Sequence, residues 1–249
     1  MTQKYYSKAP IVEAIVDIQV KMEEGFSHEA LQAVHSRLSE RFPTKQPIQM
    51  FQVDMPLGAQ VEGEMQLSPL KKSELGLRLT SEDNFRILQV RENGFAYSHL
   101  PPYTSWEVLR AEAHEAWCIF VELCKPKTVV RCALRFVNRI EIPKPSVELR
   151  DYFCLYPEVP PGIPQDVSGM FMQLQMPQKD LEGIAIVNQA VAEPTSPGTV
   201  SVLLDFDLFQ VREYAPEDEA IWHYLDKLRD RKNELFEACI TDETRRLIN

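Results

Sequence analysis

Alternating apolar and polar residues predict three long β-strands in this chain. In residues 11–20, the even positions from Val12 to Val20 are all apolar, while Glu13 and Asp17 lie on the opposite face. Because the two faces differ so clearly, we expect one side of the sheet to be covered and the other to stay exposed. Similar alternation predicts strands at 128–142 and 200–211.

Helical periodicity predicts two long amphipathic helices. The first opens at the capping-box match Thr104-x-x-Glu107 and ends before Pro126. The second begins near Pro216, which suits a first helical turn, and carries its apolar stripe to Cys239. Shorter helices are predicted at 27–41, near 146–155 and after Thr241.

Shorter strand-like segments fill the remaining stretches of the two halves. The residues Glu92-Asn93-Gly94 separate two of them and are typical of a hairpin turn. The predicted short strands are Ile48–Val53, Leu75–Leu79, Phe85–Val90, Phe95–His99, Met170–Met176 and Ile184–Ala190.

Both halves therefore follow the order strand, helix, three or four strands, long helix. An offset of 116 residues aligns Trp106 with Trp222 and Phe120 with Phe236. We predict one α+β domain over 1–249, an antiparallel sheet with two long helices on one face, and a pseudo-two-fold duplication of halves 7–125 and 126–249. This element order resembles the saddle of the TATA-box-binding protein. The alternative is a chance alignment of a few apolar residues.

Composition narrows the class of protein further. The 249 residues are 44% hydrophobic, which excludes a disordered chain, and no stretch of about 18 residues lacks charge. The formal net charge of −10 argues against gripping nucleic acid. Five cysteines without a C-x-x-C pair indicate free thiols in a reducing compartment, so we expect a cytoplasmic protein without a membrane segment.

Motifs for cofactors and catalysis are missing from the sequence. It contains neither a phosphate-binding G-x-x-x-x-G-K-S/T loop, nor a G-x-G-x-x-G turn, nor a G-x-S-x-G elbow. The five histidines lack metal-ligand spacing, so they are expected to face solvent or bond locally. We therefore expect no cofactor, no metal and no catalytic residue, although a Cys–His pair formed in space stays open.

The polar side of the strand at 128–142 carries the strongest candidate surface. Arg131, Arg135 and Arg139 lie on one face, with successive arginines about 13 Å apart. Such a row suits an extended anion or an acidic partner. The alternative is that Glu13, Asp17, Asp205 and Asp207 on neighbouring strands pair with these arginines and only solvate the sheet.

Two further features of these strands suggest chemistry. Asp205 and Asp207 share one strand face, as in sites that hold Mg²⁺ beside phosphates, but no phosphate-binding loop accompanies them. Asn138 interrupts the apolar face formed by the even positions from Val130 to Ile142. Its amide either orients a ligand or makes a structural hydrogen bond, because a buried amide needs a partner.

Two other segments are candidate contact regions. Met170, Met172 and Met176 alternate with polar residues and are expected either to pack under the last helix or to form an adaptable binding surface. The loops at 157–164 and 192–198 contain several prolines and are expected to be stiff, exposed contact sites or simple connections.

Four motifs carry a resemblance to a known family. They are APIVEAIVDI at 9–18, RFVNRI at 135–140, LLDFD at 203–207 and KNELFE at 232–237 followed by Thr241-Asp242. In this order they resemble a sporadically distributed family of uncharacterised prokaryotic proteins of about this length. Its members often show a histidine before the last motif, where this chain has the residues LRDR at 228–231. The family's scattered distribution implies accessory genes such as defence modules, and it supplies no active site.

The sequence therefore favours a cytoplasmic, non-catalytic module that binds a protein partner. The candidate contact residues are Glu13, Asp17, Arg131, Arg135, Asn138, Arg139, Asp205 and Asp207. The alternative is a protein that binds an anionic small molecule or nucleotide, or an Mg²⁺-dependent enzyme that uses the same charged face. Nucleic acid is the least favoured partner, and the oligomeric state is open.

Overall fold

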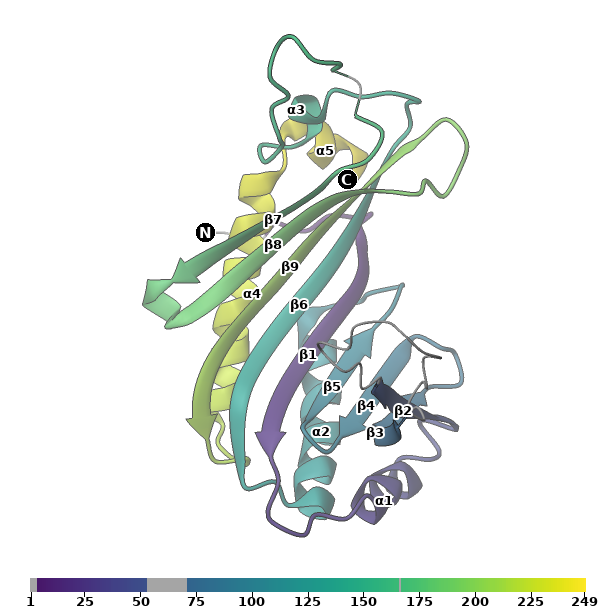
Figure 1. Ribbon diagram of the computed structural model, residues 1–249, viewed down its shortest axis with the longest axis vertical. Helices are drawn as coiled ribbons and strands as arrows, with labels where there is room; N and C mark the ends of the chain where they lie inside the picture. The colour runs from purple at the N-terminus through teal and green to yellow at the C-terminus, as the bar shows by residue number, and fades with distance from the viewer. Residues whose placement is uncertain (1–3, 53–70, 166) are drawn as a thin grey trace, which may run out of the picture.

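An antiparallel sheet forms the centre of the molecule (Figure 1). The computed structural model describes residues 4–52, 71–165 and 167–249. Within them the strands are β1 Ile11–Lys21, β2 Thr44–Gln52, β3 Lys71–Thr80, β4 Arg86–Arg91, β5 Gly94–His99, β6 Thr128–Ile142, β7 Phe171–Gln178, β8 Gly183–Ala192 and β9 Val200–Tyr214. They form one nine-stranded sheet in the order β2-β3-β4-β5-β1-β6-β9-β8-β7. Of the strand predicted to end at Val53, that last residue lies outside the described part.

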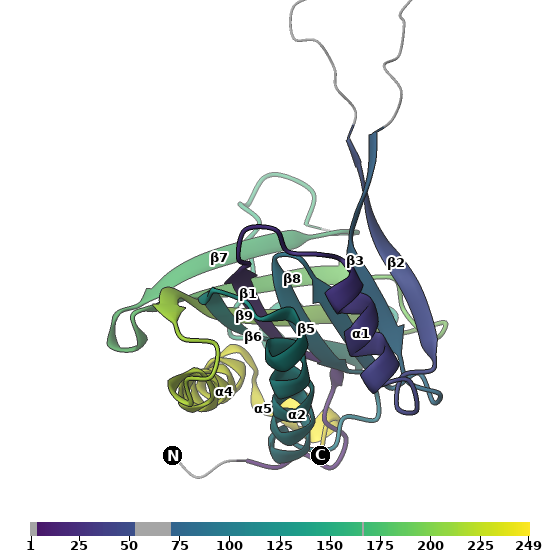
Figure 2. The same cartoon turned by 90° about the horizontal axis from the view of Figure 1, so that it is seen from below.

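The helices complete the α+β architecture that the sequence predicts. They are α1 Glu29–Arg37, α2 Trp106–Cys124, α3 Leu149–Tyr152, α4 Ala220–Cys239 and α5 Asp242–Leu247, with a 3₁₀ turn at Lys179–Leu181. Figure 2 shows α1, α2 and α4 on the same side of the sheet. None of the described helices is long and apolar enough to cross a membrane.

The core lies between these helices and the central strands. On β1 the even residues Ala14, Val16 and Ile18 are fully buried, and Val16 pairs with buried Leu134 of β6. Burial of one such Val, Leu or Ile side chain stabilises the fold by about 1.5–3 kcal/mol. The alternation read from the sequence is therefore the pattern that fixes which face of the sheet meets the helices.

A register shift corrects the predicted face of β6. In the pairing with β1, Gln19 is opposite Arg131 and the next residue, Val20, is opposite Val129, so one extra residue, Val130, enters β6 at this end. As a result Val129 is fully buried, and Val130, which the alternation places on the apolar face, is only half-buried. Beyond the shift, from Cys132 to Ile142, the predicted phase is correct.

Helix ends also differ slightly from the predicted ones. The N-cap of α2 is Ser105, one residue after the predicted Thr104, and its Oγ accepts a hydrogen bond from the backbone N–H of Val108 at 3.3 Å. The helix predicted for 27–41 is the shorter α1. The predicted hairpin turn is confirmed at Glu92 and Asn93, which join β4 to β5.

The sheet is bent, and its curvature shapes the face that the helices leave open. Figure 2 shows β7 and the β2–β3 ribbon rising away from the helices, while β1 and β6 lie closest to them. The side opposite α2 and α4 is therefore concave. We call this side the open face; it is formed by the odd-numbered residues of β1, β6 and β9, together with the side chains of β4, β7 and β8 that point the same way.

Candidate binding face on the open side of the sheet

All the predicted contact residues except Asn138 lie on the open face. Strand β1 contributes Glu13 and Asp17, β6 contributes Arg131, Arg135 and Arg139, and β9 contributes Asp205 and Asp207. The antiparallel register explains this gathering, because Arg135 is paired with Ile15 on one side and with Asp207 on the other. The candidate set therefore forms one continuous patch over three neighbouring strands.

The first part of this patch is a row of ion pairs that crosses β4, β1, β6 and β9. Asp17 accepts hydrogen bonds from Arg91 at 2.7 Å and from Arg131 at 2.9 Å. Arg131 also lies 3.4 Å from the carboxylate of Asp207. Arg91 reaches Asp17 across β5, where the small residues Gly94 and Ala96 lie between them on this side. We call this row the Asp17 ladder.

The second part is a row that continues from β6 to the edge of the sheet. Arg135 binds both carboxylate oxygens of Asp205 at 2.8 Å, in the bidentate geometry that favours a strong ion pair. Asn188 on β8 donates to Asp205 at 2.9 Å and accepts from Gln173 on β7 at 2.8 Å. We call this row the Asp205 ladder.

Arg131 and Arg135 therefore pair with carboxylates of neighbouring strands, which is the alternative that the sequence analysis gave for the arginine row. Arg139 differs, because its guanidinium donates to the backbone carbonyl of Glu193 at 3.1 Å and lies 3.5 Å from Glu141. For Glu13 no hydrogen bond or ion pair is found within the described part of the chain. Glu13 therefore makes no direct hydrogen bond or ion pair with the described residues, although its charge contributes to the raised pKa of Arg135.

Burial and charge tune two of these groups in opposite ways. The hydrogen bonds from Arg135 to Asp205 raise the pKa of the arginine, so its positive charge is held firmly. Burial raises the pKa of Asp207 above its usual 3.8, and the neighbouring arginines offset this only in part. Asp207 is consequently the carboxylate of this face whose ionised form is least well accommodated.

Apolar side chains surround the charged rows. The guanidinium of Arg131 lies 4.3 Å from the centre of the Phe209 ring, a cation–π contact. Half-buried aliphatic residues occupy the positions between the charges: Ile15, Val137, Ile186 and Leu203. Aromatic, aliphatic and arginine side chains on one concave surface are the composition that protein interfaces favour.

Asn138 belongs to the other side of the sheet and leaves the candidate set. It is 2% exposed, and its side-chain amide donates to the backbone carbonyl of Leu204 at 3.0 Å. This is the structural hydrogen bond that the sequence left as one of two alternatives. Even positions of β6 face the helices, so Asn138 has no access to the open face.

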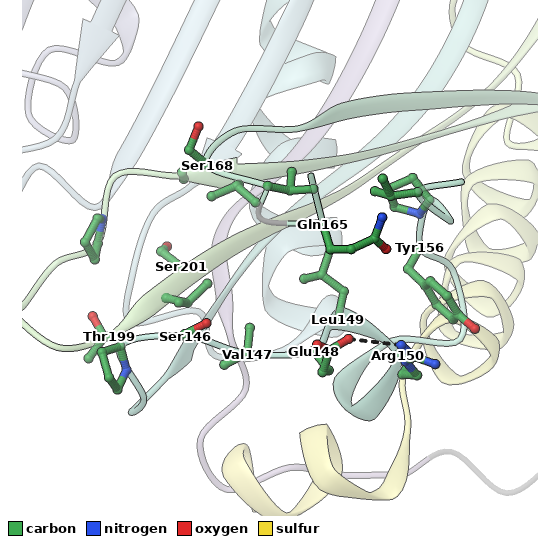
Figure 3. Close-up of a pocket in the computed structure, with 18 of the residues that line it drawn as sticks. Ser146, Val147, Glu148, Leu149, Arg150, Tyr156, Gln165, Ser168, Thr199 and Ser201 are labelled. Atoms are coloured by element: carbon green, nitrogen blue, oxygen red, sulfur yellow. Dashed lines mark hydrogen bonds and ion pairs between the residues drawn. The ribbon is translucent and has the colours of Figure 1, made fainter. Parts of the chain in front are cut away.

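A cavity of about 990 Å³ lies where the strands β8 and β9 meet the loops at one end of the sheet (Figure 3). Its walls come from residues 145–150, from 156–159 with 165, 167 and 168, and from 191–194 and 199–201. Both proline-containing loops that the sequence singles out therefore border one cavity. Glu148 and Arg150 form an ion pair of 3.1 Å on its wall.

This cavity lies at one end of the open face. Ser201 lines the cavity. It lies on the same face of β9 as Asp205, which follows it by four residues. The Ser201 side chain is fully buried, and its Oγ has no hydrogen-bond partner among the described residues. Arg139 ties the same end of the face to the loop through the Glu193 carbonyl.

Chemistry elsewhere in the described structure is sparse. No group of three or more His, Cys, Asp or Glu side chains there could hold a metal ion. Cys118 lies 4.0 Å from His114 one turn earlier on α2, which is the Cys–His proximity that the sequence left open. Burial and the nearby Glu219 raise the pKa of Cys118, so this thiol is not an activated nucleophile.

A charged cluster under α2 was not found from the sequence. Glu112 accepts hydrogen bonds from Arg86 at 2.8 Å, from His99 at 2.7 Å and from the Tyr97 hydroxyl at 3.2 Å, and it lies 3.4 Å from Arg41. We call it the Glu112 cluster. The sequence feature that could have predicted this cluster is His99, because it shares a strand face with the apolar residues Phe95 and Tyr97 of β5 and is therefore buried.

Lys232 is a second polar residue that the sequence did not identify as buried. It lies on α4 at 7% exposure, with its Nζ 4.1 Å from the centre of the Phe136 ring. Burial lowers its pKa to about 7. It faces the helix side of β6, so it does not contribute to the open face.

Comparison with known proteins adds no name to this site. The chain matches no protein-family model, and no curated protein matches its sequence. The function must therefore be argued from the open face itself.

Proposed function

We propose that this protein is a non-catalytic binding module that docks a protein partner on its concave open face, as an accessory component of a prokaryotic defence or regulatory system. The observation that carries the proposal is the charge balance of the face. The guanidinium groups of Arg131 and Arg135 are bonded to Asp17 and Asp205, so the surface is a mixed pattern of both signs. A patterned surface of this kind selects a protein with complementary charges.

The same observation weighs against the alternative of an anionic ligand. A phosphate or nucleotide would have to displace Asp17 or Asp205 from arginines that already hold them at 2.8–2.9 Å. Nucleic acid meets the further obstacle of the net charge of −10. A thermal-shift series of nucleotides with and without Mg²⁺ tests this alternative, since a ligand at 100 times its Kd adds about 2.7 kcal/mol of stability.

Affinity purification from the native host tests the main proposal. The tagged wild-type protein should retain a stoichiometric partner, which is then purified and titrated against variants. We expect R135E to weaken the complex at least about tenfold, because it reverses a charge at the centre of the face. The matched control R246E reverses an arginine on α5 whose side chain is 70% exposed, and it should leave the affinity unchanged.

Two outcomes would contradict the proposal. One is a partner that binds R135E and the wild type equally. The other is a tagged protein that is purified without any partner while a nucleotide raises its melting temperature.

We also propose that the fold arose by duplication of a unit of about half its length. Support comes from the central register, in which Asp17 of β1 pairs with Ala133 of β6. Those two residues are separated by the same offset of 116 that aligns Trp106 with Trp222, so the pair falls on a two-fold axis. The strand order β5-β1-β6-β9 is symmetric about the same axis, in keeping with a saddle-like single domain.

A further inference from the structure

Strand β7 forms one edge of the sheet and exposes apolar side chains there. It pairs with β8 on one side, and no other described segment pairs with its outer side. Phe171 is 70% exposed and Leu174 36% exposed. Met172 and Met176 are half-buried, and Met176 packs against the core, so the methionine row is only partly covered. The backbone groups on the outer side of β7 are therefore open to another strand.

The chemistry of β7 lacks the usual protection of an edge. Natural edge strands carry charges, especially lysine, or proline to discourage pairing with other chains. The opposite edge of this sheet, β2, has both in Lys45 and Pro47. By contrast, β7 reads FMQLQMPQ and carries no charge, with its one proline near the end.

The residue pattern of β7 is palindromic. Residues 172–176 read Met-Gln-Leu-Gln-Met, the same in both directions, with Leu174 at the centre. In an antiparallel pair of two such strands centred on Leu174, Met172 faces Met176, Gln173 faces Gln175 and Leu174 faces itself. Each opposing pair then joins residues of the same kind on the same face of the sheet.

We propose that two copies of this chain pair through β7 about a two-fold axis at Leu174, which extends the sheet into a second molecule. The row Met172, Leu174 and Met176 would continue across the axis on the helix side, because Leu174 pairs with buried Val187 and shares its face. The glutamines would meet on the open side, where Gln173 bonds Asn188. Phe171 of each copy would face Pro177 of the other.

Charge explains why a second copy fits this edge. The protein carries a net charge of −10, so two copies repel each other wherever acidic surfaces meet. Strand β7 carries no charge, so two copies of it can meet without repulsion. Such a two-fold interface is complete with two molecules. The proposed dimer would place two open faces side by side on one continuous sheet.

Light scattering coupled to size exclusion tests the dimer directly. The wild type should elute with twice the monomer mass of 28.7 kDa. Two double variants at the same exposed positions then test the register. Q173E/Q175E sets acid against acid across the axis and should give a monomer, whereas Q173E/Q175K sets opposite charges together and should keep the dimer.

Three outcomes would overturn the proposal. They are a monomeric wild type over the full concentration range, a dimer that survives Q173E/Q175E, and loss of the dimer in both double variants alike. Circular dichroism should show the same fold in all three proteins. R135E separates the two proposals: it lies on β6, so it should weaken partner binding and leave the dimer mass unchanged.

Discussion

The molecule places arginines and carboxylates together in two regions that differ in what surrounds them. In the Glu112 cluster, Glu112 and four partners lie on the helix side, where α2 covers the sheet and His99 is fully buried. In the Asp17 and Asp205 ladders, similar ion pairs lie on the concave face that no described helix covers (Figure 2). The same side-chain chemistry therefore occurs once between the sheet and a helix, and once on a face of the sheet that no described helix covers.

This difference teaches how to separate structural from functional charge in one protein. A charge between layers has its partners fixed by packing, and its loss leaves other groups buried and unpaired. The ladder charges are no more exposed, since the side chains of Asp17 and Asp205 are 21% and 9% exposed against 26% for Glu112. Their difference is that no described helix packs over them, so they are the charges that a docked partner would meet. We expect variants of the Glu112 cluster to act on folding, and variants of the ladders to act on both folding and partner binding.

The largest effect is expected for E112Q. The variant removes the negative charge that receives hydrogen bonds from Arg86 and His99, and the amide cannot accept them all. We expect a loss of about 2–3 kcal/mol in the free energy of unfolding, measured by urea denaturation. E115Q on the same helix is the control, because that side chain is 67% exposed and should lose less than about 0.5 kcal/mol. Equal losses in both variants would contradict the comparison.

A smaller and asymmetric effect is expected within the ladders. D205N breaks the bidentate pair with Arg135 and the bond from Asn188, and should cost about 1–2 kcal/mol. D207N should change stability by less than about 0.5 kcal/mol, or raise it slightly. The sign follows from the raised pKa of Asp207, whose stabilising contribution is present below pH 3.8 and lost as the pH rises through its folded value. Thermal unfolding at neutral pH measures both variants. A melting temperature of D207N below that of D205N would contradict the roles given to the two carboxylates.

The smallest effect is a pH dependence that arises at His99. Burial and the charge of Arg86 lower its pKa, and the short bond to Glu112 offsets this only in part. The unfolded chain then binds a proton more readily, so the stability present above pH 6.5 is lost as the pH falls through the folded pKa. H99Q keeps a donor for Glu112 but does not titrate, and it should flatten the stability profile on the acid side of pH 6.5. An unchanged slope in H99Q would assign the effect to another group.

Much of the fold follows from local pattern. The alternation in β1 and β9 and the periodicity of α2 identify the buried faces, because packing against a helix demands continuous apolar rows. The extra residue in β6 could not be predicted, since a bulge is decided by how both neighbouring strands fit. The N-cap of α2 was predicted one residue too early, because Thr104 and Ser105 both carry a hydroxyl that can cap a helix.

The site was predictable to the extent that it lies within single strands. Arg131, Arg135 and Asp205 were identified because charged residues at period two must share a face. Arg91 and Asn188 were not, because their part in the ladders depends on the order of strands in space. That order brings β4 within reach of β1 only because β5 offers Gly94 and Ala96 between them.

The central claim is that the open face binds a protein partner, and Glu13 offers the most direct test. Its carboxylate has no ion pair among the described side chains, so E13R reverses a charge on this face without removing a hydrogen bond of either ladder, although it places a second positive charge near Arg135. The measurement is calorimetric titration of the co-purified partner into wild type and E13R, with the melting temperature of each. The account predicts a melting temperature only slightly lower than that of the wild type, because the new charge lies near Arg135, and an affinity at least about tenfold weaker, which corresponds to about 1.4 kcal/mol. An unchanged affinity would contradict the claim that the partner binds here.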